Sequence, residues 1–240
     1  MENPSKRIDV GATLNHAIEL YKKTFLISGM AFLFITVFLM TIAFIGIQFF
    51  IGFEVAAEQM KTFDPANLSL KGTLIYLCAL LLITILIAPF SAGILKMMQD
   101  ADSNEEVTLS SLFYYVNSPY YTPIIMSTVI LSIISFGLNI GVQKIIPDKS
   151  MGSIISMLLS IIFSVITLLS IPNIIFKDMP VLRAIKSSIS QTSSNFFQIL
   201  LLLAIAVIIG YFGLIAFCIG IFFTFPIYFA VQYCIYKSLE

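Results

Sequence analysis

The chain has 240 residues, of which 59% are hydrophobic and only 11% are charged, and its formal net charge is zero. Soluble domains average about 45 to 50% apolar and about 25% charged residues, so this composition excludes an ordinary water-soluble domain and places most of the chain in lipid. The zero net charge also excludes nucleic acid as an expected partner, because phosphate binding depends on clustered basic residues.

Long apolar runs predict membrane-spanning helices, since about 20 apolar residues cross the hydrocarbon core of a bilayer. Four runs meet this length, at residues 25–53, 73–95, 123–142 and 153–176. A fifth run, residues 196–236, would be about 60 Å long as one helix and is expected to fold back near Gly213. We therefore expect an all-helical polytopic membrane protein with six transmembrane helices, forming a single integral membrane domain over residues 1–240.

Lysine and arginine residues near the ends of spans favour the cytoplasmic side of a membrane. With the N-terminus inside, nine of the 13 basic residues lie on the cytoplasmic side and the remaining four lie on the other. No signal peptide is expected, because the first 23 residues are polar and amphipathic. The predicted location is the bacterial cytoplasmic (inner) membrane, with both termini cytoplasmic.

Three segments between the spans carry apolar residues at helical spacing, namely residues 10–25, 109–116 and 181–196. Such segments are expected to be cytoplasmic interfacial amphipathic helices, the first with Asp9 as its N-cap. Each precedes an outgoing span, and each returning span carries a proline. This order predicts a degenerate threefold repeat of helical hairpins, with pseudo-repeats at residues 9–100, 107–178 and 179–240.

The prolines of the returning spans are Pro89, Pro172 and Pro226. Each removes a backbone donor and can kink its helix, so the three kinks fit either a gate or a bent wall that lets the hairpins nest. The bent wall is favoured, because no charged residue lies near the kinks.

Two stretches resemble a known membrane family. They are Ala17-Ile18-Glu19-Leu20-Tyr21-Lys22-Lys23-Thr24-Phe25 near the start, and Phe225-Pro226-Ile227-Tyr228 followed by Tyr236-Lys237 near the end. Together with the six-span layout they are similar to the membrane domain of glycerophosphoryl diester phosphodiesterases and to related uncharacterised bacterial integral membrane proteins. The phosphodiesterase members of this family add a catalytic barrel with acidic and histidine metal ligands. That barrel is not found here, so the resemblance transfers no catalytic residue.

None of the five apolar runs contains an aspartate, glutamate, lysine, arginine or histidine. Ionisable residues inside membranes are usually functional, so their absence argues against an ion-coupled transporter. We also expect that the chain is not an enzyme and binds no cofactor or metal. The only histidine, His16, has just Glu19 near it in sequence and is expected on the interfacial surface.

The remaining candidate ligands also favour structural roles. The acidic cluster lacks the spacing of a calcium loop and is expected to be a solvated connector, whereas the cysteines lie in apolar runs and are expected to be small buried residues. The acidic residues are Asp100, Asp102, Glu105 and Glu106, and the cysteines are Cys78, Cys218 and Cys234.

Two polar faces stand out within the third and fourth spans. One consists of Thr128, Ser132, Ser135 and Asn139, and the other of Ser153, Ser156, Ser160 and Ser164, continued by Thr167. Hydroxylated faces let helices pack closely through hydrogen bonds, with Gly137 and Gly141 adding a GxxxG pattern. Helix packing is the favoured interpretation, and a polar path for a solute, with Asn139 and Asn173 as ligands, is the alternative.

These observations predict a non-catalytic accessory or scaffold subunit of a larger assembly in the membrane, concerned with translocation, insertion or envelope biogenesis. Its expected partners are membrane lipids and another membrane protein. The alternative is a transporter or channel for a small neutral or lipid-like solute that uses the two hydroxylated faces. An enzyme of lipid headgroups ranks third, because it rests on the resemblance alone.

Overall fold

The computed structural model describes residues 7–50, 52, 54–55, 58, 61, 68–146, 148–215 and 220–240. These residues form helices and no β-strand, which confirms the predicted all-helical class. The helices are α1 (Val10–Phe50), α3 (Leu70–Asp102), α4 (Tyr121–Ile145), α5 (Lys149–Thr167), α6 (Ser170–Lys177), α7 (Val181–Ser193), α8 (Phe196–Phe212), α9 (Gly220–Thr224) and α10 (Ile227–Leu239), with short 3-10 helices η2 (Leu109–Phe113) and η3 (Gly213–Ile215).

Five segments are long and apolar enough to cross a membrane, which marks the chain as a membrane protein by length and composition. They are Val10–Phe49, Leu70–Asp102, Tyr121–Ile145, Lys149–Lys177 and Phe196–Ile215. The sixth predicted span corresponds to α9 and α10, which have five and 13 residues and are individually too short to cross. The chain reverses between α8 and α9, close to the predicted turn at Gly213, while residues 216–219 lie outside the described part.

The first amphipathic segment differs from the prediction of a separate interfacial helix. α1 runs without a break from Val10 to Phe50. Asp9 caps it as predicted, because its Oδ1 accepts a hydrogen bond of 3.0 Å from the N–H of Ala12. No proline or glycine stands at the junction near Phe25, so the helical hydrogen bonds continue from the amphipathic part into the apolar part.

The second amphipathic segment differs from the prediction too. It forms η2, a 3-10 helix of five residues, and not an α-helix. It lies directly against α3, where a Cβ added to Gly93 would be 2.2 Å from the carbonyl oxygen of Leu112. Only glycine allows two backbones to approach this closely.

The third amphipathic segment forms α7, whose buried side consists of small residues. The inward residues are Ala184, Ser188 and Thr192, whereas Leu182 and Ile189 are exposed. The small inward residues let α7 pack closely on the α5–α6 junction.

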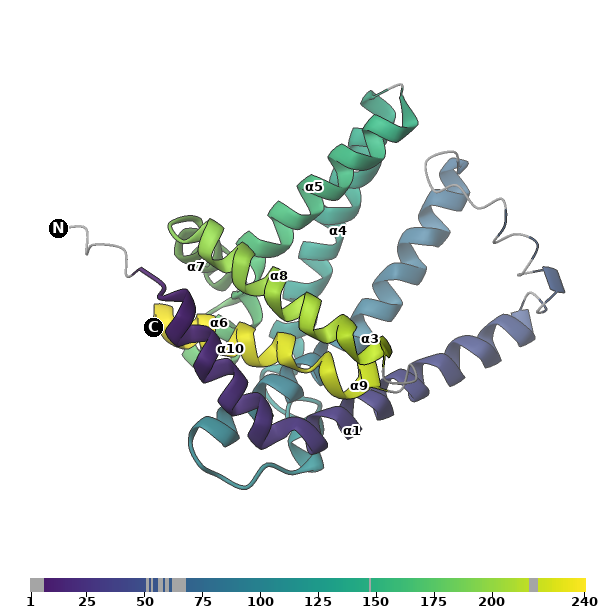
Figure 1. Cartoon of the computed structure of the whole chain (residues 1–240). Helices are drawn as coiled ribbons and strands as arrows, with labels where there is room; N and C mark the ends of the chain where they lie inside the picture. The colour runs from purple at the N-terminus through teal and green to yellow at the C-terminus, as the bar shows by residue number, and fades with distance from the viewer. Residues whose placement is uncertain are drawn as a thin grey trace.

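The core lies around α10, which packs against α1, α3 and α8. Ala230, Val231 and Ile235 are fully buried there. The start of α1 lies beside the end of α10, where the hydroxyl oxygens of Thr13 and Ser238 are 3.2 Å apart. α10 and the first half of α1 cross close to the C-terminus (Figure 1).

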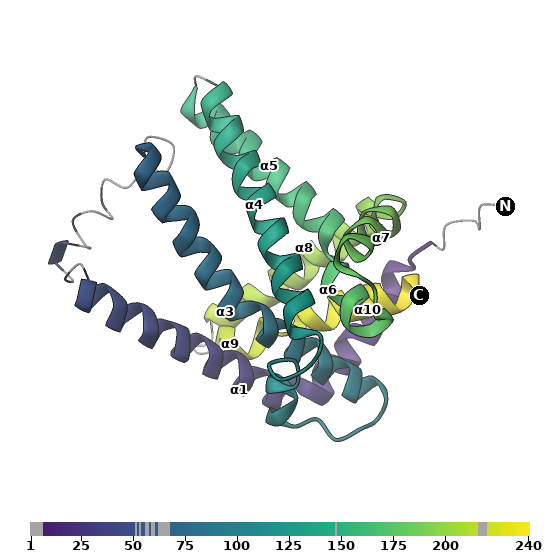
Figure 2. The same ribbon diagram turned by 180° about the vertical axis from the view of Figure 1, so that it is seen from behind.

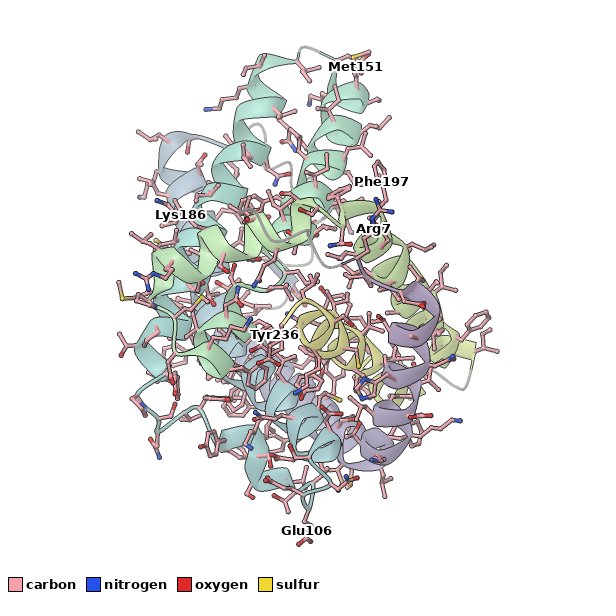
Figure 3. The ribbon with its side chains drawn as sticks, turned by 90° about the vertical axis from the view of Figure 1, so that its left-hand side faces the viewer. Arg7, Glu106, Met151, Lys186, Phe197 and Tyr236 are labelled. Atoms are coloured by element: carbon pink, nitrogen blue, oxygen red, sulfur yellow. The ribbon has the colours of Figure 1, made fainter. Side chains whose placement is uncertain are left out.

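Away from this core the long helices diverge. The α4–α5 hairpin projects from the body, and α3 and the second half of α1 extend in other directions, as both ribbon views show (Figures 1 and 2). Met151 marks the tip of the hairpin, and Glu106 lies at the opposite end of the molecule (Figure 3). The far ends of α1 and α4 are strongly exposed, with Phe49 82% and Ile145 79% exposed.

The three prolines occupy different positions. α3 continues through Pro89, Pro172 lies just after the interruption between α5 and α6, and Pro226 lies between α9 and α10. Two of the three returning segments are therefore interrupted helices, because proline cannot donate the backbone hydrogen bond that would continue the helix.

Candidate functional site

A groove of about 540 Å³ lies between α3, α4 and α5. Its floor is a stripe of α4 at the spacing of one helix face, formed by Thr128, Leu131, Ser132, Ser135, Phe136, Asn139, Ile140 and Gln143. From Thr128 to Gln143 the stripe is about 22 Å long at 1.5 Å per residue. The groove therefore covers most of the roughly 30 Å thickness of a hydrocarbon core.

The two walls of the groove differ in chemistry. The α5 wall is largely hydroxylated and consists of Ser160, Phe163, Ser164 and Thr167, with Ile171 of α6 beyond it. The α3 wall is largely apolar and consists of Tyr76, Leu77, Leu80, Leu81 and Thr84. The rings of Tyr76 and Phe136, 5.9 Å between centroids, join α3 to α4 along the groove.

The structure brings most of the predicted polar residues together. Six of the eight residues proposed from sequence line the groove, namely Thr128, Ser132, Ser135, Asn139, Ser160 and Ser164. Ser153 and Ser156 are not among the lining residues: Ser153 is exposed, and Ser156 is buried with no hydrogen-bond partner for its Oγ among the described residues. The sequence did not predict the α3 wall, because Tyr76 and Thr84 are its only polar residues and form a weak signal in a largely apolar helix.

Asn139 connects the two polar faces across the helix pair. Its Nδ2 donates to Ser160 Oγ at 3.1 Å and to the backbone carbonyl of Ser135 at 2.9 Å. This bond between α4 and α5 is the packing contact expected from the hydroxylated faces, and it lies on the surface of an open groove. The residues of this packing contact therefore also line the groove.

Most groove hydroxyls donate their proton to their own helix. A serine or threonine in a helix commonly bonds to a carbonyl three or four residues earlier, which leaves the lone pairs of its oxygen free to accept. The bonds are Thr84 to Leu81 (3.0 Å), Thr128 to Ile124 (2.9 Å), Ser160 to Ser156 (2.8 Å), Ser164 to Ile161 (2.8 Å) and Thr167 to Phe163 (2.7 Å).

The groove has no charged side chain among its described lining residues. Acid-base catalysis needs an ionisable group within reach of the substrate, and among the described lining residues only the Tyr76 phenol is ionisable. No group of three histidine, cysteine or acidic side chains in the described part of the chain is placed to hold a metal ion. The lining is thus suited to binding an uncharged molecule.

The GxxxG pattern does not serve helix packing within this chain. A Cβ added to Gly137 or Gly141 would meet no atom within 4 Å. The expected close approach is wrong because the polar face of α4 turns toward α5, which leaves the two glycines on another side of the helix.

A second cluster of polar side chains forms hydrogen bonds with backbone groups at the interruption between α5 and α6. Ser188 of α7 accepts from the N–H of Leu169 at 3.0 Å and donates to the carbonyl of Ile166 at 2.9 Å. Thr192 donates to the same carbonyl at 3.2 Å. Asn173, proposed as a solute ligand, is fully buried here, and its Nδ2 donates to Gln191 Oε1 at 3.2 Å. Asn173 is therefore part of this structural cluster and does not line the groove.

The structure corrects the predicted roles of His16 and the acidic cluster. His16 Nε2 lies 2.8 Å from Asp102 Oδ1, and Tyr233 donates to Asp102 Oδ2 at 3.0 Å, which ties α1, α3 and α10 together. Asp100 is buried and accepts from Ser111 at 3.0 Å. These contacts join residues 86 and 131 positions apart, so the local sequence does not reveal them.

Other candidates lie outside the groove or have ordinary surroundings. Glu105 and Glu106 are exposed, as a connector requires. Cys234 is buried as predicted, whereas Cys78 is exposed, contrary to the prediction, because it faces away from the other described helices. Cys218 lies outside the described residues.

Comparison with known proteins found no family model, no curated protein and no solved structure that matches this chain.

Proposed function

We propose that this chain is a six-span membrane protein that binds a neutral lipid-like solute in the groove and guides it along the bilayer normal. The observation that carries the proposal is the uncharged groove beside α4. Its length is about 22 Å, from the rise of 1.5 Å per residue in a helix. Its 540 Å³ falls in the range of about 300 to 1,000 Å³ that is typical of ligand sites. A groove that is open along a membrane helix admits molecules directly from lipid.

The sixth span would consist of α9 and α10 together. Residues Gly220 to Leu239 would extend about 30 Å as a continuous helix, which matches the hydrocarbon thickness. The basic residues then favour a bacterial cytoplasmic membrane with both termini in the cytoplasm. α7 would lie in the membrane interface, since Arg183, Lys186 and the apolar Leu182 are all exposed on it.

A threefold repeat of hairpins is part of the proposal. Equivalent lysines follow the first two prolines, and each lies over a tyrosine ring. Lys96 Nζ is 5.4 Å from the ring centroid of Tyr114, and Lys177 Nζ is 5.2 Å from that of Tyr236. The first two hairpins thus share the order of a proline, a lysine and a cation–π contact.

Proteoliposomes test the solute proposal. The measurement is the rate at which a fluorescent neutral diacylglycerol analogue moves between leaflets. Leu131→Phe fills the floor of the groove and is expected to lower the rate severalfold, while Leu138→Phe on the exposed side of the same helix leaves it unchanged. A wild-type rate equal to that of protein-free liposomes would contradict the proposal.

The accessory-subunit hypothesis remains as a second candidate, favoured by the open space beside Gly137 and Gly141. Small residues on an unpartnered membrane helix allow another helix to approach closely. Gly137→Leu and Gly141→Leu are expected to abolish copurification of a partner from native membranes. Unchanged copurification patterns would remove this candidate and would not affect the groove.

A further inference from the structure

The hydrogen-bonding roles inside the groove are unequal. Along the α5 wall, Ser160, Ser164 and Thr167 each donate their only hydroxyl proton to a backbone carbonyl of their own helix. Their oxygens therefore face the groove as acceptors. A ligand group that meets this wall must supply the proton.

Asn139 adds one more acceptor. Its Nδ2 is fixed as the donor because it bonds to the carbonyl of Ser135, which can only accept. Its Oδ1 lies 3.4 Å from Ser160 Oγ, but the proton of Ser160 is committed to Ser156 at the shorter distance of 2.8 Å. The amide oxygen is thus available to a ligand.

The floor of the groove supplies neutral donors. Ser132 and Ser135 have hydroxyls that can rotate, and Gln143 has an amide. A ligand hydroxyl both donates to the α5 wall and accepts from the floor. An ether or ester oxygen can only accept hydrogen bonds. A phosphate would bring negative charge to a lining without a basic residue, so nothing there would offset the free-energy cost of removing the phosphate from water.

The groove suits a lipid chain, because it is about 22 Å long and one of its walls is largely apolar. A single extended hydrocarbon chain fits beside the leucines of the α3 wall, Leu77, Leu80 and Leu81.

We propose that the groove selects a lipid with a neutral alcohol headgroup, whose hydroxyl donates to the acceptors of the α5 wall and Asn139 while its chain packs on α3. Long-chain alcohols and acylglycerols with a free hydroxyl belong to this class. The inference rests on the proposed binding function and specifies the ligand of the same groove.

The chain contains no tryptophan, so a single introduced tryptophan reports on the groove. Leu80→Trp lies on the α3 wall, with Leu77→Trp as a second reporter, and Ile45→Trp on the exposed side of α1 reports on bulk lipid. The probes are a brominated long-chain alcohol, its methyl ether and its phosphate monoester, each titrated into nanodiscs. The alcohol is expected to quench the groove reporters at a tenfold lower mole fraction than the other two, and the three probes to quench Ile45→Trp alike.

Two variants test the acceptors directly. Ser164→Ala and Thr167→Val in the Leu80→Trp background are expected to reduce the advantage of the alcohol severalfold. Ser193→Ala and Thr41→Val are matched controls, because their hydroxyls also bond to their own helices, at Ile189 and Val37, but lie outside the groove.

The two levels of the proposal fail in different ways. If all three probes quench the groove reporters equally, and more strongly than Ile45→Trp, then alcohol selectivity is wrong and binding in the groove stands. A preference for the phosphate or the ether also overturns the selectivity. If no probe distinguishes the groove reporters from Ile45→Trp, the binding function itself is wrong.

Discussion

Gln232 of α10 donates a hydrogen bond from Nε2 to the backbone carbonyl of Leu168 at 2.8 Å. This carbonyl lies four residues before Pro172, which has no N–H to donate to it. A side chain 64 residues away thus supplies the hydrogen bond that the proline removed. Buried backbone groups need such partners, especially where no water reaches them.

Gln232→Leu is expected to lower the free energy of unfolding by about 1 to 3 kcal/mol, because it leaves a buried carbonyl without a partner. Pro172→Ala restores an N–H four residues after Leu168, so the same change should cost much less in that background. Denaturant titration in micelles, followed by circular dichroism, measures both values. An equal cost of Gln232→Leu in the two backgrounds would show that the proline and the glutamine are not coupled.

Gly93→Ala is expected to destabilise the contact between α3 and η2 by several kcal/mol. The new Cβ would lie 2.2 Å from the carbonyl oxygen of Leu112, and a backbone atom cannot move aside as a side chain can. Gly137→Ala is the matched control, since nothing lies within 4 Å of its Cβ. That change should be neutral or stabilise α4 by up to about 1 kcal/mol through helix propensity. Melting temperatures in one detergent compare the two variants.

Asp102→Ala is expected to cost more stability than His16→Ala. The aspartate holds two partners on different helices, His16 and Tyr233, whereas the side chain of His16 is partly exposed and has one such hydrogen bond, worth about 1 kcal/mol. In a double-mutant cycle, His16→Ala should have little further effect once Asp102 is alanine. Full additivity of the two costs would contradict the contact.

Asn139→Leu is expected to weaken the pairing of α4 with α5. Hydrogen bonds between membrane helices average about 0.6 kcal/mol, so the loss of stability should be small. In a double-mutant cycle with Ser160→Ala, the two losses should be less than additive. Ser164→Ala is the control, because its hydroxyl bonds only to its own helix. A cycle in which Asn139 couples to Ser164 as strongly as to Ser160 would argue against the observed pair.

The candidate site was predictable only in part. The spacing of Thr128, Ser132 and Asn139 places them on one face of a helix whatever the fold is, and the structure puts that face along the groove. The opposing wall around Leu80 was not predicted, because Tyr76 and Thr84 are too few to mark one face of the largely apolar α3.

The interruptions of the helices illustrate the same division. Pro172 and Pro226 indicate where backbone donors are missing, and α6 and α10 begin beside them. The side chains that donate hydrogen bonds in place of these missing N–H groups come from distant parts of the chain. Gln232, which donates to the carbonyl of Leu168, is an example. Local sequence does not encode which distant side chain will arrive.

The sequence by itself determined that this protein is helical and lies in a membrane, because apolar runs of this length satisfy their backbone hydrogen bonds in lipid only as helices. It also placed the hydroxylated faces of the third and fourth spans. The tertiary structure alone decided that His16 meets Asp102, that Gly137 and Gly141 stay unpartnered, and that α3 leaves a groove beside α4. Those outcomes depend on which helix surfaces pack together, and nearly uniform apolar surfaces carry little information about that choice.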